Sequence, residues 1–277
     1  MLRNHVPGRI ADGVVPAART AERIVCLTEE TTEALYLMGE GDRVVGVSGY
    51  TVRPREARSK PKVSAFITAK FDKIESLRPD LVLAFSDLQA DIVAELVRRG
   101  MNVVCFNQRS VAEILWMVET LGALVGVPEK GRELSESLRD GLADIAREAA
   151  TFARRPAVFF EEWYDPLISG IRWVSELIDI AGGRDVYEEL RDCHDAKRRI
   201  VQAEDVVPRA PDLIIGSWCG RKFRPELVRS RPGWSEIPAV RNGRLVEIKS
   251  TIILQPGPAA LTDGVRALHD AIRSAVT

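Results

Sequence analysis

Five aromatic residues and a few basic ones carry the chemistry that this sequence indicates most strongly. The aromatic residues, which follow apolar runs or stand in expected loops, are Tyr50, Phe66, Trp163, Trp173 and Trp218. Ligands of parallel α/β folds bind beyond the carboxyl ends of the strands, in pockets that are mostly apolar and aromatic. We therefore predict that these side chains line a ligand site, to which Arg172, Arg221, Lys222 and Arg224 add positive charge. Core packing is the alternative for any one of the aromatic residues.

Two acidic residues, Asp72 and Glu204, stand at matching places, each seven residues before a Pro-Asp-Leu triplet. Each opens an expected helix, where the helix dipole favours a carboxylate by about 0.3–1 kcal/mol. Helix stabilisation is one interpretation. The other is that two acids at the tips of one face dock onto two basic spots of a symmetric partner.

The sequence contains no catalytic motif. It has no G-x-x-x-x-G-K-[ST] loop, no G-x-S-x-G elbow and no H-E-x-x-H pair. The segment Asp192-Cys193-His194-Asp195 holds metal-ligand residue types, and it is interpreted either as a solvated loop or as a contact to a ligand or metal. We therefore assign no catalytic residue, no metal ligand and no cofactor of the protein's own.

Apolar runs alternate with helical stretches along the chain. The runs expected as strands are Ile24–Leu27, Val44–Val47, Leu81–Phe85, Val103–Phe106, Ala157–Phe160, Leu213–Gly216 and Leu245–Ile248. Most are continuous, which is typical of parallel strands buried on both faces. Helices are expected at Thr31–Met38 and Gln89–Arg99, each followed by a glycine. The pattern predicts an α/β fold.

The two halves of the chain resemble each other at a constant offset. Residues 72–83, DKIESLRPDLVL, align with residues 204–215, EDVVPRAPDLII, at an offset of 132. The same offset places Arg23 on Arg155 and Leu35 on Leu167. Several matches at one offset indicate two related α/β lobes. The alternative is that the entries to strands simply have similar sequences.

Residues 129–152, between the two halves, contain no proline and carry apolar side chains at helical spacing. Such a helix would be roughly 36 Å long and would join two lobes as a stiff spine that allows a small rocking motion. We predict an N-terminal arm (1–22), an N-terminal α/β lobe (23–126), a bridging helix (127–154) and a C-terminal α/β lobe (155–277). The predicted fold class is α/β, with two Rossmann-like parallel-sheet lobes bridged by one long α-helix.

The charge balance excludes some partners. The 277 residues include 39 basic and 40 acidic ones, for a net charge of −1, so no global field holds nucleic acid or an acidic membrane. No apolar run approaches the ~18–20 residues that span a bilayer. Residues 1–22 lack the apolar stretch of an export signal, so we expect a cytoplasmic protein unless the start is misassigned. We also expect a monomer.

The sequence resembles the class III substrate-binding proteins of ABC importers, specifically the vitamin B12-binding type and its iron–siderophore relatives. The resemblance extends from about Arg23 to Val276. The segments that carry it are RIVCL (23–27), TE (32–33), VGVSGY (45–50), KIESLRPDLVL (73–83), EWYDPL (162–167), AGG (181–183) and APDLI (210–214). The fifth and sixth segments, with Gly170 between them, resemble the B12-binding branch in particular.

The resemblance implies a ligand in the cleft between two lobes, namely cobalamin, haem or an iron chelate. It implies that Asp72 and Glu204 are the paired acids that contact arginines of a dimeric membrane permease. The ligand positions carried over are Tyr50 and Phe66 in the first lobe and Trp163, Trp173 and Trp218 in the second. One departure is that Gly170-Ile-Arg172-Trp173 lacks the histidine expected after the glycine in the B12-binding branch.

We therefore expect a substrate-binding protein, not an enzyme, that captures a metal chelate such as cobalamin, a ferric siderophore or haem for an ABC importer. The alternative is a cytosolic enzyme or metallochaperone built on the same two lobes. A paired acid and base, or a Cys/His cluster in the cleft, would favour that alternative.

Overall fold

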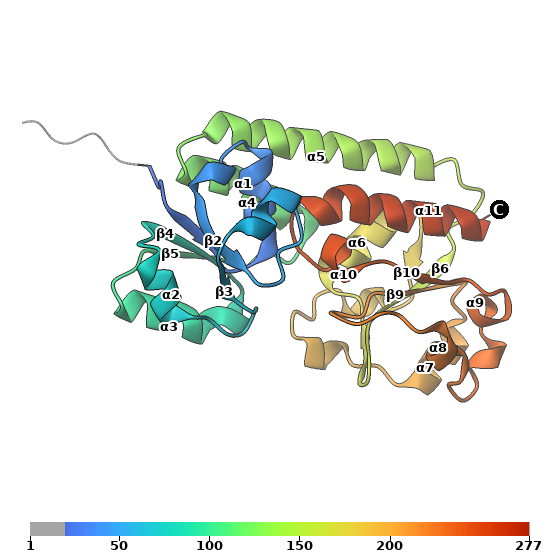
Figure 1. The fold of residues 1–277 in the computed structure, drawn as a ribbon. Coiled ribbons are helices and arrows are strands. Elements are labelled where there is room, and N and C mark those ends of the chain that lie inside the picture. Colours follow the sequence, from blue (N-terminus) through green and yellow to red (C-terminus); the bar gives the residue numbers. More distant parts are fainter. Residues whose placement is uncertain (1–19, 277) are drawn as a thin grey trace, which may run out of the picture.

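The computed structural model describes residues 20–276 of the chain. Two β-sheets form the centres of two lobes, and one long helix, α5 (Pro128–Ala149), runs across both of them (Figure 1). The fold is therefore α/β with two lobes bridged by a long helix, which confirms the predicted fold class. The predicted N-terminal arm, residues 1–22, lies outside the described residues except for residues 20–22.

The first sheet has the strand order β3-β2-β1-β4-β5, and every neighbouring pair is parallel. Its strands are β1 (Ile24–Cys26), β2 (Val44–Ser48), β3 (Lys62–Ser64), β4 (Leu81–Phe85) and β5 (Val103–Phe106). The helices of this half are α1 (Glu29–Leu37), α2 (Phe71–Ser76), α3 (Ala90–Arg98) and α4 (Val111–Leu124), with short turns η2 (Gly41–Arg43), η3 (Arg55–Ser59) and η4 (Asp87–Gln89). All four predicted strands are confirmed, and β3 is an addition.

The second sheet has the order β10-β9-β6-β7, and β8 also pairs with β6. Its strands are β6 (Ala157–Tyr164), β7 (Leu167–Ser169), β8 (Arg184–Asp185), β9 (Leu213–Gly216) and β10 (Leu245–Glu247). Only β7 is antiparallel to its neighbour. The helices are α6 (Arg172–Ile180), α7 (Ala203–Arg209), α8 (Pro225–Arg229), α9 (Pro238–Arg241), α10 (Ser250–Ile253) and α11 (Val265–Val276), with short turns η5 (Glu188–Leu190), η6 (Ala196–Arg199), η7 (Trp234–Glu236) and the π-helical η8 (Ala260–Gly264).

Two sequence-based placements are wrong. Trp163 was expected to follow a strand, but β6 extends to Tyr164 because it forms a hairpin with β7, so Trp163 lies within the strand. Trp173 was expected in a loop, but it lies in the first turn of α6. Its neighbours Val174, Leu177 and Ile178 are also buried, and this helical spacing draws Trp173 into the core.

The bridging helix α5 packs against α4 at a very close crossing. A Cβ atom added at Gly122 of α4 would lie 2.7 Å from the Cα of Gly131 of α5, so only glycines allow this approach. At its start α4 has a capping box, in which Ser110 and Glu113 each bond the other's backbone N–H. Helix α11 runs beside α5 and supports it from the side of the second lobe (Figure 1).

The repeated Pro-Asp-Leu triplet has the same structural role in both lobes. In the first lobe the carboxylate of Asp80 accepts hydrogen bonds from the backbone N–H groups of Glu22 and Arg23, at 2.8 and 3.0 Å. In the second lobe Asp212 accepts one from the backbone N–H of Ala157, at 2.9 Å. Each aspartate thus fixes the start of a central strand, β1 or β6, against its neighbour.

The residue two places before each aspartate has a left-handed backbone conformation. Arg78 has φ of 47° and Ala210 has φ of 44°, and these positions are equivalent at the offset of 132. Each ends the short helix that precedes the triplet, and Ala210 is the C-cap of α7. The repeat therefore preserves a backbone turn that leads each helix into a buried strand.

A second connection joins the lobes besides α5. Residues 256–263 cross from the second lobe to α1, where the backbone N–H of Ala259 donates to the carboxylate of Glu33 at 3.1 Å. The same carboxylate accepts from Arg53 at 2.9 Å, and Arg53 pairs with Asp263 at 2.7 Å. The prediction of one bridging element was therefore incomplete.

We predict that Ala210→Gly stabilises the protein. Glycine adopts the left-handed conformation without the penalty of a Cβ atom, so the free energy of unfolding should rise by roughly 0.5–1 kcal/mol. Urea unfolding would measure the change. The control is Ala146→Gly on the exposed face of α5, which should lower the same quantity by about 1 kcal/mol. A loss of stability in Ala210→Gly would contradict the strained turn.

Candidate functional site

The carboxyl ends of the first-lobe strands carry exposed apolar side chains, here called the apolar rim: Tyr50, Phe66, Ile67 and Leu88. Tyr50 is 59% exposed, Ile67 65% and Leu88 59%, whereas Phe66 is half-buried. Gln89 ties two of the loops together because its side-chain amide donates to the carbonyl of Phe66 at 2.6 Å. Exposed apolar groups gathered at one place are typical of an interaction surface. Sequence reasoning identified Tyr50 and Phe66 and missed Ile67 and Leu88.

The second lobe presents a cluster of aromatic rings in mutual contact, here called the aromatic cluster: Trp163, Tyr164, Trp218 and Phe223. The ring centroids of successive members lie 5.2, 4.6 and 5.2 Å apart. Arg221 lies over the first two rings, and its guanidinium donates to the Tyr164 hydroxyl at 2.7 Å. Trp163 and Trp218, both predicted from the sequence, are thus brought together by Tyr164, which lies between them.

A buried ion pair holds the aromatic cluster in place. Glu161, on β6, is fully buried and accepts from the indole N–H of Trp218 at 3.0 Å. Its two oxygens also accept from the guanidinium of Arg231 at 2.7 and 2.8 Å. Because a buried carboxylate must be paired, this arrangement fixes the orientation of the Trp218 ring.

Trp173 lies away from this cluster. It is only 3% exposed, belongs to the hydrophobic core between α6 and its neighbours, and donates its indole N–H to the carbonyl of Ile253 at 2.9 Å. In this structure Trp173 therefore presents no face to a ligand, and the core interpretation describes it. Trp218 is equally buried, but one edge of it lines a pocket described below.

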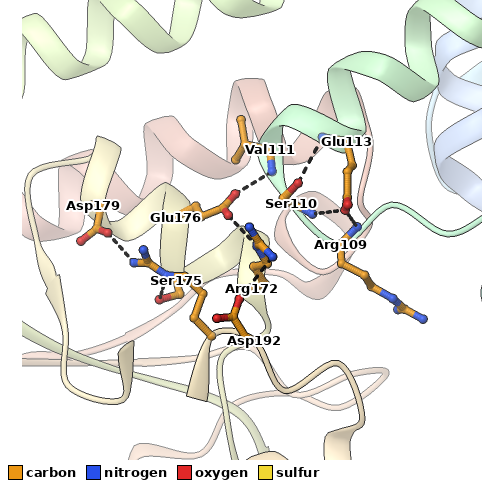
Figure 2. Close-up of polar contacts among 10 residues, drawn as sticks. Arg109, Ser110, Val111, Glu113, Arg172, Ser175, Glu176, Asp179 and Asp192 are labelled. Carbon is orange, nitrogen blue, oxygen red and sulfur yellow. Dashed lines mark hydrogen bonds and ion pairs between the residues drawn. The ribbon is translucent and has the colours of Figure 1, made fainter. Parts of the chain in front are cut away.

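Arg172 lies in a polar network at the junction of the lobes (Figure 2). Its Nε donates to Glu176 at 2.8 Å and its Nη1 to Asp192 at 3.2 Å. The other oxygen of Glu176 accepts from the backbone N–H of Val111, the first residue of α4, at 2.7 Å. Arg172 thus helps to hold α6 against α4 and anchors the loop at Asp192, and its role near a ligand stays a prediction.

Charged groups from the two lobes face each other. Burial raises the pKa of the Cys219 thiol in the second lobe, and the carboxylates of Glu162 and of Glu29 in the first lobe raise it further. Burial lowers the pKa of Arg109 in the first lobe, and the charge of Arg199 in the second lobe adds to this effect. These influences act between the lobes, from Glu29, which follows β1, to Cys219, which follows β9, and from Arg199 to Arg109.

A pocket of about 270 Å³ opens at the carboxyl ends of β9 and β10, beside the aromatic cluster. Its lining residues are Trp218, Gly220, Arg221, Lys222, Glu247, Ile248, Lys249, Ser250 and Thr251. Arg221 and Lys222 were expected near the ligand from the sequence, whereas Lys249 was not. The pocket lies where ligands of parallel sheets generally bind.

The acids Asp72 and Glu204 lie in α2 and α7, which sit at the outer ends of the two lobes, on the side away from α5 (Figure 1). The side chain of Asp72 is 96% exposed and is approached by Arg99 at 3.1 Å. Glu204 is exposed and makes no ion pair within residues 20–276. The two helices therefore place both acids on the same side of the molecule. Of the two, only Asp72 forms an ion pair within the described residues.

A pair of buried acids occupies the start of α1. Burial and the charge of neighbouring Glu29 raise the pKa of Glu30 to about 8. Burial also raises the pKa of Glu29, which accepts from the Ser48 hydroxyl at 2.7 Å. Glu30 packs against Gly257 of the crossing segment, where an added Cβ atom would lie 2.5 Å from the Cβ of Glu30. One oxygen of Glu30 has no hydrogen-bond partner.

Within residues 20–276, no group of three or more His, Cys, Asp or Glu side chains is arranged to hold a metal ion. In the segment 192–195, Asp192 pairs with Arg172, while His194 and Asp195 are exposed. This agrees with the solvated-loop interpretation of that segment. The described part of the chain also has no helix long and apolar enough to cross a membrane.

The family is established by comparison with known proteins. Residues 24–252 match the family described as periplasmic binding protein, and the chain belongs to that family. This confirms the family expected from the sequence. Its members are binding proteins and not enzymes, so the enzyme alternative is not favoured.

Particular relatives cover nearly the whole chain. An uncharacterized ABC transporter substrate-binding lipoprotein of Bacillus subtilis, YvrC, is 29% identical over 93% of this chain and 82% of its own. The periplasmic vitamin B12 binding protein BtuF of Vibrio cholerae has 25% sequence identity to this chain. Its crystal structure superposes with a TM-score of 0.74 and covers 92% of this chain and 98% of its own. A periplasmic heme binding protein from Pseudomonas aeruginosa has 21% sequence identity to this chain. Its crystal structure superposes with a TM-score of 0.78 and covers 93% of this chain and 94% of its own.

We predict that Glu30 makes stability fall as the pH rises. Its pKa is about 8 in the folded protein and 4.5 when unperturbed, so between these values the folded chain keeps a proton that the unfolded chain has lost. The free energy of unfolding should therefore decrease from about pH 5 to about pH 8 and then level off. Glu30→Gln should reduce this decrease, and urea unfolding over that pH range would measure it.

The control for this prediction is Glu136→Gln on the exposed face of α5, which should leave the pH dependence of the wild type unchanged. If Glu30→Gln also leaves it unchanged, Glu30 is not the buried acid that the structure indicates.

Proposed function

We propose that this protein is the substrate-binding component of an ABC importer and captures a metal chelate, such as cobalamin, haem or a ferric siderophore, between its lobes. The observation that carries the proposal is that the apolar rim and the aromatic cluster lie at strand ends of facing lobes. A flat ligand with a large apolar face would be covered from both sides by such surfaces.

The names of the relatives support this class of ligand. BtuF of Vibrio cholerae binds vitamin B12, and the Pseudomonas aeruginosa protein binds heme. Both are metal-centred macrocycles, and YvrC is described as an ABC transporter substrate-binding protein. The identities are too low to choose between these ligands, and we therefore propose the class of ligand.

The rings of the aromatic cluster suit a macrocycle for a physical reason. Stacked aromatic groups gain about 0.5–1.5 kcal/mol per pair beyond the burial of their area. The cluster is held rigid by Glu161 and Arg231, so little side-chain entropy is lost when a ligand binds. Half-buried Trp163 lies at the accessible end of the cluster and is the ring best placed to meet a ligand.

We further propose that Asp72 and Glu204 dock onto basic groups of a permease dimer. They belong to repeat-equivalent helices, α2 and α7, at the outer ends of the two lobes. A dimer with twofold symmetry presents two equal sites, and two related lobes present two equal acids. Because Glu204 is exposed and forms no ion pair within residues 20–276, its carboxylate is available to a partner.

Trp163→Ala should weaken ligand binding by about tenfold or more, because one face of the ligand loses an aromatic partner. Titration with cobalamin, haem and a panel of ferric siderophores, followed by tryptophan fluorescence, would measure the dissociation constants. The wild type should bind at least one of these chelates saturably. Failure to bind any of them would overturn the proposed function.

The matched control is Trp116→Ala. Trp116 is an exposed tryptophan of α4 that lies outside the aromatic cluster and the apolar rim. This variant also loses one fluorophore but should keep the affinity of the wild type. Trp116→Ala should unfold at nearly the wild-type urea concentration because its ring is exposed, whereas Trp163→Ala, which loses a half-buried ring, should unfold at a somewhat lower one and remain folded in the binding assay. Equal affinity of the two variants would place the ligand elsewhere.

Charge reversal should separate docking from ligand binding. The double variant Asp72→Lys with Glu204→Lys should keep its ligand affinity but bind vesicles containing the cognate permease at least about a hundredfold more weakly. Of the single variants, Glu204→Lys should lose more, because Asp72 is already partly neutralised by Arg99. The control is Glu136→Lys with Asp140→Lys on α5, which makes the same charge change. Unimpaired docking of the first variant would leave both acids as helix-stabilising groups.

A further inference from the structure

We propose that the pocket beside the aromatic cluster binds an oxyanion on the edge of a tetrapyrrole ligand, either a carboxylate or a phosphate. The inference rests on the proposed function and narrows it to the tetrapyrrole class. It also assigns separate roles to two parts of the second lobe. The aromatic cluster covers the flat face of the ligand, and the pocket, here called the oxyanion pocket, binds its charged edge.

The charges that line the oxyanion pocket are unbalanced. Arg221, Lys222 and Lys249 face it, and Glu247 is the one carboxylate in its lining. The chain as a whole has a net charge of −1, so this local excess of positive charge is not a property of the general surface. A concave site lined by one sign of charge attracts ions of the opposite sign.

The pocket also has unused hydrogen-bond donors. Lys222 makes no ion pair within residues 20–276, and the hydroxyls of Ser250 and Thr251 form no hydrogen bond there. Lys249 contacts Glu247 at 2.8 Å, which leaves two of its three N–H groups free. These donors come from two loops, one after β9 and one after β10, so that they surround the pocket from two sides.

Glu247 is committed to the protein and leaves the basic groups available. It accepts from the backbone N–H of Phe223 at 3.3 Å as well as from Lys249. The charges of Lys249 and Lys222 and these hydrogen bonds hold its pKa below its ordinary value, against the opposing effect of burial. Its carboxylate thus orients Lys249 and the loop that follows β9.

The oxyanion pocket is continuous with the aromatic cluster. Trp218 belongs to both. Arg221 also lines the pocket, and its guanidinium lies over the Trp163 and Tyr164 rings. A ring system stacked on Trp163 would therefore place its edge within reach of the basic side chains. Haem combines a broad apolar face with two carboxylates on its edge, and cobalamin carries a phosphate on a side chain of its ring. The aromatic cluster and the basic pocket complement such a combination of groups.

The test compares two pairs of probes that differ in the oxyanion. Iron protoporphyrin carries two carboxylates that its dimethyl ester lacks. Cobalamin carries a phosphate, with the attached ribose and base, that cobinamide lacks, so in this pair only a difference that the lysine variant removes is assigned to the phosphate. Each would be titrated into the wild type and into Lys222→Gln with Lys249→Gln, following tryptophan fluorescence and ligand absorbance. The control is Arg229→Gln with Arg241→Gln, which removes two exposed, unpaired charges from the same lobe.

The wild type should bind the anionic member of one pair about tenfold or more tightly than the member without the oxyanion. A difference of this size is expected when one hydrogen bond to a charged group is lost. The Lys222 and Lys249 variant should lose most of that difference and keep the affinity for the neutral probe, while the control keeps both. The pair that shows the difference identifies carboxylate or phosphate.

Two results would overturn the inference. One is that the wild type binds both members of each pair equally, or that the lysine variant keeps the full difference. The other is that none of the four probes binds. In that second case, binding of a ferric siderophore would leave the proposed function standing, and the absence of any chelate binding would remove both.

Discussion

The relative position of the two lobes depends on a carboxylate that is shared between them. Glu33, in α1 of the first lobe, accepts from Arg53 of its own lobe and from the backbone N–H of Ala259, which belongs to the segment returning from the second lobe. Arg53 in turn reaches Asp263 of that segment. Because a buried carboxylate is costly without partners, the contacts on both of its sides tend to persist together. With α5 as a second, stiff connection, the lobes are restricted to small relative movements, and their strand ends remain opposite each other.

This restriction explains how a site can be built from two separate surfaces. The apolar rim belongs to loops of the first sheet and the aromatic cluster to strands and loops of the second, so neither surface alone encloses a ligand. The second surface is the more rigid one, since Glu161 and Arg231 fix it from within. A buried ion pair contributes little net stability, and here it keeps an aromatic ring in a defined orientation.

The strands and the long helix could be predicted because their signals are local. Parallel strands buried on both faces give continuous apolar runs, and all seven predicted strands are present. The repeat was visible because Asp80 and Asp212 each fix a central strand, so that the same triplet recurs. The spacing of Val174, Leu177 and Ile178 indicates that Trp173 lies in a helix. The start of that helix was harder to predict, because its N-cap residue, Ile171, has no side chain that can cap it.

The candidate site was less predictable because its parts meet only in the folded chain. Arg172 was placed with the ligand on its charge alone, whereas its partners Glu176 and Asp192 follow from helical spacing and from a distant loop. Ile67 and Leu88 are ordinary apolar residues in the sequence, and their exposure results from the turns in which they lie. Lys249 lies beside the same pocket as Lys222 because β10 pairs with β9. The sequence of the two strands does not indicate this pairing.

The placement of charge links the site to the outer face of the molecule. Positive groups gather at the oxyanion pocket, while Asp72 and Glu204 lie on the outer helices, so the groups offered to a ligand and to a docking partner lie in separate regions of the chain. Each region can act on a different partner without interfering with the other, because exposed charges are screened beyond about 10 Å at moderate ionic strength. The spacing between the two acids is set by the same contacts that set the opening between the lobes. A partner that contacts both acids would therefore respond to the angle between the lobes.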